Sequence, residues 1–96
     1  LLDEKTFLDV FQGVPIFNIE RRKLEASINV QELLAEETEV FGSKGEVKRL
    51  IKGGGLSVNK EKVQSLEDNI STNALLNEKY ILVQKGKKNY FIIKAE

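Results

Sequence analysis

With 96 residues, 41% of them apolar, and a formal net charge of zero, the chain has the length and apolar content of a single compact domain. It contains no cysteine and no histidine, which excludes disulfides, thiolate and imidazole metal ligands, and Ser–His or Cys–His nucleophilic pairs, so we expect no catalytic residue and no metal site here. No apolar run approaches the roughly 18 residues that a membrane-spanning helix requires, and we expect no membrane partner.

The start of the chain predicts a helix and then a break. Residues 3–12 have the apolar spacing of a short helix, which we expect Gly13 to cap at its C-terminal end. Residues 15–19 favour a brief extended segment. The chain contains no methionine, so we interpret it as a segment of a longer protein. We expect residues 1–28 to be the lead-in from a preceding domain and residues 29–96 to form the domain itself.

Two short helices are predicted next. Asn29 is a suitable N-cap for a helix whose apolar residues repeat at i, i+3 and i+4 from Val30. A second helix begins at Ser43, where a capping box is expected. In this box the Ser43 hydroxyl accepts a hydrogen bond from the backbone N–H of Glu46, and the Glu46 carboxylate reaches back to the N–H of Ser43. Three glycines from Gly53 onward end the second helix.

The remaining chain predicts a small sheet. Residues 56–58 and 61–63 alternate around a tight turn at residues 59–60, and residues 80–84 and 90–94 are two strong strands joined as a hairpin. We therefore predict an α+β fold. In this fold two short packed helices, an αL-type motif, lie against a small, mainly antiparallel sheet, with an N-terminal lead-in helix.

Positive charge is concentrated in the second half of the chain. Residues 1–42 carry nine acidic and four basic side chains, whereas residues 43–96 carry six acidic and eleven basic ones. In the second helix Lys44, Lys48 and Lys52 recur at i, i+4 and i+8. Such a row can neutralise several RNA phosphates at once, although basic rows are also common on ordinary solvated helix faces.

A specific combination of motifs runs through residues 43–59. The segment SKGEVKRLIKGGGLSVN, with its Ser-x-x-Glu cap, basic helix, glycines, alternating strand and asparagine, resembles the RNA-binding domain named after ribosomal protein S-four. The wider pattern, SKGEVKRLIKGGGLSVNKEKV followed by KYILVQKGKKNYFII, resembles the C-terminal domain of bacterial tyrosyl-tRNA synthetases.

This resemblance implies a domain that binds tRNA, most specifically tyrosine tRNA, while ATP-dependent attachment of tyrosine takes place in an N-terminal catalytic domain outside this chain. It further implies a cytoplasmic parent enzyme that binds ATP and forms a homodimer through that missing domain, with no cofactor in these residues and no DNA partner. The RNA-binding residues that it implies are Ser43, Lys44, Lys48, Arg49, Lys52, Asn59, Lys60, Lys85, Lys87 and Lys88.

Two other functions remain open from the sequence. A domain of this kind also serves RNA-modifying enzymes of the pseudouridine synthase type. The third interpretation is a protein-interaction domain without any RNA role, in which the basic residues only form an ordinary water-exposed surface.

Overall fold

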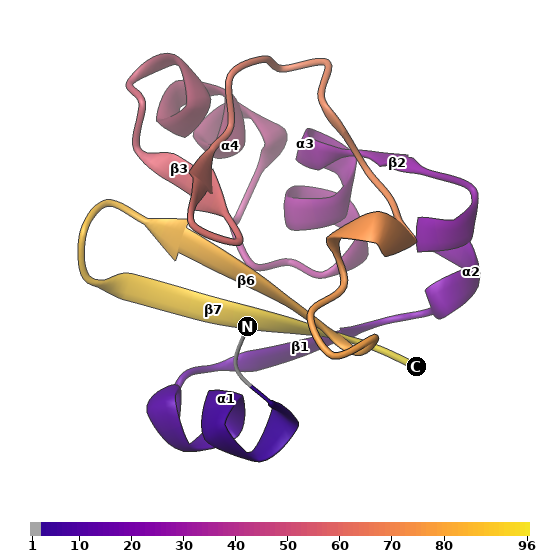
Figure 1. Cartoon of the computed structure of the whole chain (residues 1–96). Helices are drawn as coiled ribbons and strands as arrows, with labels where there is room; N and C mark the ends of the chain where they lie inside the picture. Colours follow the sequence, from indigo (N-terminus) through magenta and orange to yellow (C-terminus); the bar gives the residue numbers. More distant parts are fainter. Residues whose placement is uncertain (1–2) are drawn as a thin grey trace.

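In the computed structural model, which describes residues 3–96, helices cover both faces of a mixed sheet (Figure 1). The helical segments are α1 (Glu4–Val10), α2 (Arg21–Glu25), α3 (Val30–Glu32), the π-helical turn η1 (Leu33–Glu37), α4 (Lys44–Lys52) and the 3₁₀ turn η2 (Thr72–Ala74). The strands are β1 (Ile16–Ile19), β2 (Ile28–Asn29), β3 (Leu56–Val58), β4 (Glu61–Lys62), β5 (Asn69–Ile70), β6 (Tyr80–Lys85) and β7 (Asn89–Ala95).

Within residues 3–96 the main sheet has five strands in the order β1-β7-β6-β3-β4, and β2 and β5 form a separate antiparallel pair. The β6–β7 hairpin and the β3–β4 hairpin occur where the alternating patterns predicted them, and β3 joins them by pairing antiparallel with β6. Only β1 is parallel to its neighbour, with Ile16 opposite Ile92 of β7. The predicted α+β fold, with two packed helices against a mainly antiparallel sheet, is confirmed.

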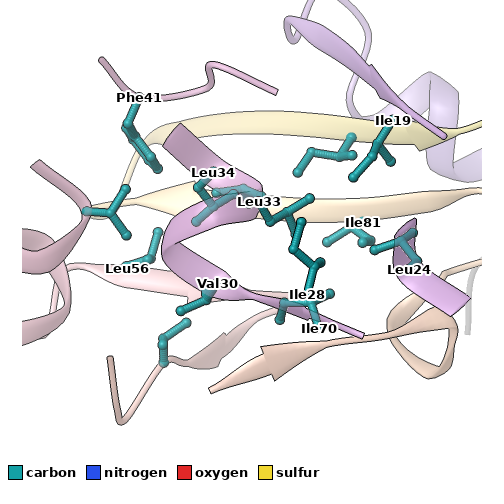
Figure 2. Close-up of a cluster of buried hydrophobic side chains, with 14 of the residues drawn as sticks. Ile19, Leu24, Ile28, Val30, Leu33, Leu34, Phe41, Leu56, Ile70 and Ile81 are labelled. Carbon is teal, nitrogen blue, oxygen red and sulfur yellow. The ribbon is translucent and has the colours of Figure 1, made fainter. Parts of the chain in front are cut away.

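The larger core fills the space between one sheet face and the helices α2, α3, η1 and α4 (Figure 1). Because side chains alternate along a strand, Ile81, Val83 and Ile93 all enter this core and are fully or almost fully buried. Leu33 and Leu34 of η1 belong to the same core, and Figure 2 shows their side chains between the helix and the strands, with Ile81 nearby. Each such side chain contributes about 1.5–3 kcal/mol through removal from water.

A smaller core lies on the opposite sheet face, which α1 covers (Figure 1). There the Phe7 ring of α1 packs with Tyr80, Leu82 and Ile92. The Tyr80 hydroxyl donates a hydrogen bond of 2.8 Å to a carboxylate oxygen of Glu4 in α1. Burial, and secondarily this hydrogen bond, raises the pKa of Tyr80. The hydrogen bond from Tyr80, followed by one from Lys79, lowers the pKa of the Glu4 carboxyl.

The end of α1 differs from the prediction. The helix stops at Val10, and Phe11 occupies the C-cap position instead of Gly13. Gly13 lies in the following turn with a φ of +87°, a left-handed conformation that glycine adopts without steric cost. The turn is closed by a hydrogen bond from the Val14 N–H to the Phe11 carbonyl, so the chain reverses before the helix could extend to the glycine.

The segment interpreted as a lead-in contributes to the main core. Ile19 of β1 is 4% exposed, and Leu24 of α2 is fully buried. The Arg21 N–H donates to the carbonyl of Glu96, and the Glu96 N–H donates to the carbonyl of Ile19, so backbone hydrogen bonds join the last residue to the junction of β1 and α2. None of the helices between residues 3 and 96 is long and apolar enough to pass through a lipid bilayer.

Candidate nucleic-acid interface

The helix α4 begins with a capping arrangement close to the predicted one. Ser43 has an extended backbone, and its hydroxyl oxygen accepts a hydrogen bond of 3.2 Å from the Glu46 N–H, as expected. The predicted return contact is wrong by one residue, because the Glu46 carboxylate accepts from the N–H of Gly42 at 3.1 Å instead of that of Ser43.

The glycines end α4 as the sequence predicts. Gly53 is the C-cap, and Gly54 follows with a φ of +72°. The Gly54 N–H donates to the carbonyl of Ile51 at 3.1 Å, and the Gly55 N–H donates to the carbonyl of Leu50 at 2.8 Å. These two hydrogen bonds form a Schellman motif, which satisfies carbonyls that would otherwise lack a partner at the end of the helix.

Between these caps α4 is strongly amphipathic. Val47 and Ile51 are buried in the main core, at 0% and 7% exposure. Because side chains three and four residues apart share a helix face, the basic residues project together on the side away from the core. We call this surface the α4 basic face, and its residues, all exposed, are Lys44, Lys48, Arg49 and Lys52.

The β6–β7 hairpin brings a second group of lysines to the same end of the molecule (Figure 1). The Gly86 N–H at its tip donates a 2.8 Å hydrogen bond to the carbonyl of Gly55, which lies directly after α4. The Lys85 ammonium lies 3.5 Å from a carboxylate oxygen of Glu46 in the first turn of α4. These two contacts fix the tip of the hairpin beside α4. We call Lys85, Lys87 and Lys88 the tip lysines.

Asn59 and Lys60 occupy the predicted tight turn between β3 and β4, both with positive φ. The Asn59 side chain is engaged within the fold, since its amide donates to the Ala74 carbonyl at 2.6 Å and its oxygen accepts from the Leu82 N–H at 2.9 Å. The Lys60 ammonium donates to the Tyr90 hydroxyl at 2.7 Å and lies 4.6 Å from the centre of its ring.

The structure therefore brings some of the proposed RNA-binding residues together and separates others. The α4 basic face and the tip lysines lie beside each other. Lys60 lies toward the opposite sheet face, because Tyr90 packs with the smaller core under α1. Two of the lysines form ion pairs with carboxylates. The Lys44 ammonium lies 3.4 Å from a carboxylate oxygen of Glu36, and Lys85 is paired with Glu46 as described above. The Lys44–Glu36 pair is exposed and the Lys85–Glu46 pair is partly buried, but solvent reaches both ammonium groups, so phosphates can compete for them.

Lys62 is a basic residue that the sequence pattern did not single out. Its side chain crosses the end of α4, where its Nζ would lie 3.4 Å from a Cβ at Gly54. The turn at residues 59–60 causes this placement, because it folds β4 back and sets Lys62 opposite Ser57. The ammonium is thereby held near the carbonyl end of the helix, where positive charge is favourable. Within residues 3–96 no cluster of three acidic side chains could hold a metal ion.

Residues 6–93 match the family described as the tyrosine–tRNA ligase SYY-like C-terminal domain. Similar curated proteins include the tyrosine–tRNA ligase of Porphyromonas gingivalis, 47% identical over 95 residues, which are 99% of this chain and 22% of the relative. The tyrosine–tRNA ligase of Bacteroides fragilis is 50% identical over the same shares of both chains. That of Flavobacterium johnsoniae is 46% identical over 98% of this chain. The chain thus spans 22% of the length of these relatives.

Proposed function

Since the chain belongs to the family of SYY-like C-terminal domains of tyrosine–tRNA ligases, we propose that it binds tRNA, and specifically tyrosine tRNA, through the α4 basic face and the tip lysines. The observation that carries this proposal is that the tip of the hairpin is held beside α4, which brings these two groups of cations next to each other. Gly86 is hydrogen-bonded to Gly55, and Lys85 is paired with Glu46, so the lysines of the hairpin stand beside those of the helix.

The mechanism is charge neutralisation on a rigid surface. The Ser43 cap and the Schellman motif fix both ends of α4, and its buried residues hold it against the sheet, so little backbone order has to be gained on binding. An RNA backbone presents its phosphates in rows, and a row of ammonium groups with the Arg49 guanidinium matches several of them. Ser43 adds a hydroxyl at the start of the helix.

In this proposal the ligase reaction occurs elsewhere in the parent protein. ATP, tyrosine and the acceptor end of the tRNA meet in a catalytic part outside these 96 residues, and the homodimer contacts of the cytoplasmic parent are also outside them. Family membership supports this division, because the chain matches the family of C-terminal domains. The chain described here holds the tRNA in position for that chemistry.

The test is a titration of the chain with tyrosine tRNA and with an unrelated tRNA at two salt concentrations. If about five phosphates are neutralised, the log–log slope of affinity against salt is about −4. The variant Lys48→Glu/Arg49→Glu reverses two charges at the centre of the α4 basic face and should weaken binding by at least about 100-fold. Both side chains are exposed, so folding is expected to persist.

The matched control is Lys5→Glu/Arg22→Glu, which changes the net charge equally at exposed positions of α1 and α2. It should bind within a few-fold of the unchanged chain. Retention of full binding by the α4 variant would exclude the proposed interface. An affinity that does not change with salt concentration would instead favour a protein-interaction role. Equal affinities for both tRNAs would contradict the proposed specificity for tyrosine tRNA.

A further inference from the structure

A cavity of about 340 Å³ lies on the α1 side of the sheet. Its wall is formed by the rings of Phe7 and Phe11 from α1 and by Leu82 from β6, and Leu75 and Leu76 close it from the loop that precedes β6. Lys60, in the turn between β3 and β4, lies at the edge of the cavity. This volume is within the range of small-molecule sites and matches one nucleoside more closely than a larger ligand.

The cavity combines aromatic and aliphatic walls with one cation at its edge. Phe11 is tilted against Phe7, with ring centres 5.1 Å apart, and against Tyr90, with ring centres 5.4 Å apart. An aromatic surface of this kind accepts any base, because every base has a π-face. Among the described residues no carboxylate lines the cavity, so an anionic ligand meets no like charge there.

Lys60 is oriented for a phosphate at this edge. Its ammonium donates one hydrogen bond to the Tyr90 hydroxyl and lies over the Tyr90 ring, while the residue as a whole is exposed. An ammonium has three N–H donors, so two remain for oxygen atoms of a ligand. The contact with Tyr90 limits the motion of the lysine, which reduces the entropy lost when it binds a phosphate.

The same hairpin connects this cavity with the α4 basic face. Lys62 of β4 extends across Gly54 at the end of α4, and Lys60 precedes it by two residues at the edge of the cavity. Cations therefore continue from Lys52, in the last turn of α4, around the sheet edge that β4 forms. An RNA strand that follows these cations passes from one face of the sheet to the other.

We propose that this cavity takes one unpaired nucleotide of the bound RNA, with the base between Phe11 and the leucine side chains and its phosphate on Lys60. The inference rests on the proposed function for the identity of the ligand, but the nucleotide site can be tested without tRNA. A base held in the cavity adds a second kind of contact to the neutralisation of phosphates. Such a base has to be unstacked from its neighbours in the RNA.

The experiment follows the amide resonances of the isotope-labelled 96-residue chain while each of the four nucleoside 5′-monophosphates is added. We expect saturable shifts at Lys60, Leu76 and Leu82, with dissociation constants of millimolar order. Ribose 5-phosphate and inorganic phosphate are the reference ligands, and of these three cavity residues they should shift Lys60 only. If the nucleotides cause no more change at Leu76 and Leu82 than the two reference ligands do, the cavity is not a nucleotide site.

Two variants with matched controls separate the contributions of the Phe11 ring and the Lys60 ammonium to nucleotide binding. Phe11→Ala removes the stacking ring and should weaken nucleotide binding by at least about fivefold. Phe17→Ala removes another half-buried phenyl ring, packed on Phe91 away from the cavity, and should leave nucleotide binding unchanged. Equal losses in both phenylalanine variants would overturn the proposal. Lys60→Ala should weaken nucleotide binding about threefold to tenfold, whereas Lys5→Ala, at an exposed position of α1 that does not line the cavity, should not.

The two proposals fail in different ways. If tRNA does not bind to the α4 basic face but nucleotides still shift Leu76 and Leu82, the cavity remains a nucleotide site and the proposed function is wrong. If tRNA binds and its affinity is the same for Phe11→Ala and Phe17→Ala, the proposal that the α4 basic face binds tRNA is retained, and the cavity does not receive a base. A cavity that takes an aromatic peptide side chain, but no nucleotide, would likewise overturn the proposal.

Discussion

Glu46 and Lys85 join the first turn of α4 to the β6–β7 hairpin, with a carboxylate oxygen 3.5 Å from the ammonium nitrogen. The same carboxylate accepts the Gly42 N–H through its other oxygen. Glu46 thus has two separable effects. A glutamine in its place could still accept the hydrogen bond from the Gly42 N–H, but its neutral amide could not neutralise the Lys85 ammonium. The pair is only partly buried, and ion pairs that solvent reaches contribute about 0.2–1 kcal/mol, so the hydrogen bond between Gly55 and Gly86 is expected to keep the hairpin in place without the charge.

The variant Glu46→Gln should therefore bind tRNA about two- to threefold more tightly at low salt, because it removes a negative charge from the proposed interface. Its free energy of unfolding should fall by less than about 1 kcal/mol. Binding titrations at two salt concentrations measure the first effect, and urea unfolding measures the second. Glu67→Gln, at an exposed loop position, makes the same charge change and should alter neither quantity. Weaker binding by Glu46→Gln would show that the ion pair orients Lys85 productively.

Asn59→Ala should cost about 2–3 kcal/mol of stability, because the Leu82 N–H loses its acceptor and alanine is strained at a φ of +53°. Asn59→Gly loses the same side-chain hydrogen bonds without that strain, so it should be about 1 kcal/mol more stable than Asn59→Ala. Urea unfolding of the two variants measures the difference. A loss of RNA binding in folded Asn59→Gly, with stability unchanged, would instead assign the Asn59 amide to the RNA.

Gly54→Ala and Gly86→Ala form a matched pair for Lys62. Both glycines have positive φ, +72° and +66°, so an alanine at either position should cost about 1 kcal/mol of folding stability. A Cβ at Gly54 would come into van der Waals contact with the Lys62 side chain, 3.4 Å from its Nζ, whereas no heavy atom lies within 4 Å of a Cβ at Gly86. We expect only Gly54→Ala to weaken tRNA binding, by about two- to fivefold through displacement of one ammonium. Equal binding by both variants would place Lys62 outside the interface.

The contact of Glu4 with Tyr80 predicts a change of stability in acid. The pKa of Glu4 is lowered in the folded state, so its contribution is fully present above the ordinary value of 4.5 and is lost as the pH falls through the lowered pKa. Glu4→Gln should reduce stability at pH 7, and its unfolding midpoint in urea should approach that of the unchanged chain near pH 3.

Glu25→Gln, at the exposed end of α2, serves as the control for the acid experiment. Its unfolding midpoint should follow that of the unchanged chain at both pH values. A difference between Glu4→Gln and the unchanged chain that is the same at pH 3 and pH 7 would contradict the assignment of this stability to the ionised carboxylate.

Local patterns predicted those parts of the fold that neighbouring residues determine. The spacing of lysines on α4, the Ser43 cap, the glycine termination and the β6–β7 hairpin all depend on contacts within a few residues, and the structure has each of them. The return contact of Glu46 was misplaced because the box motif fixes the partner only to within a residue, and the path of the chain at Gly42 decides which N–H is nearer.

Contacts between distant segments could not be predicted in this way. β1 was recognised as extended, but its partner lies 76 residues away, with Ile16 opposite Ile92. The π-helical turn closes because both the N–H and the hydroxyl of Thr38 donate to the Leu33 carbonyl, at 3.2 and 2.7 Å, and nothing in the helical spacing signals that choice. The placement of the tip lysines beside α4 likewise depends on tertiary hydrogen bonds.

The order of strands in the sheet has a consequence for how the chain is made. β7 is synthesised after every other strand, yet it lies between β1 and β6 and pairs with both. A ribosome adding about 5–20 residues per second leaves β1 without its partner for several seconds, until β7 has emerged. During that interval the apolar residues of β1 and α2, including Ile19 and Leu24, have no completed sheet to cover them. A product that stops before Asn89 therefore leaves these residues exposed to proteases and chaperones.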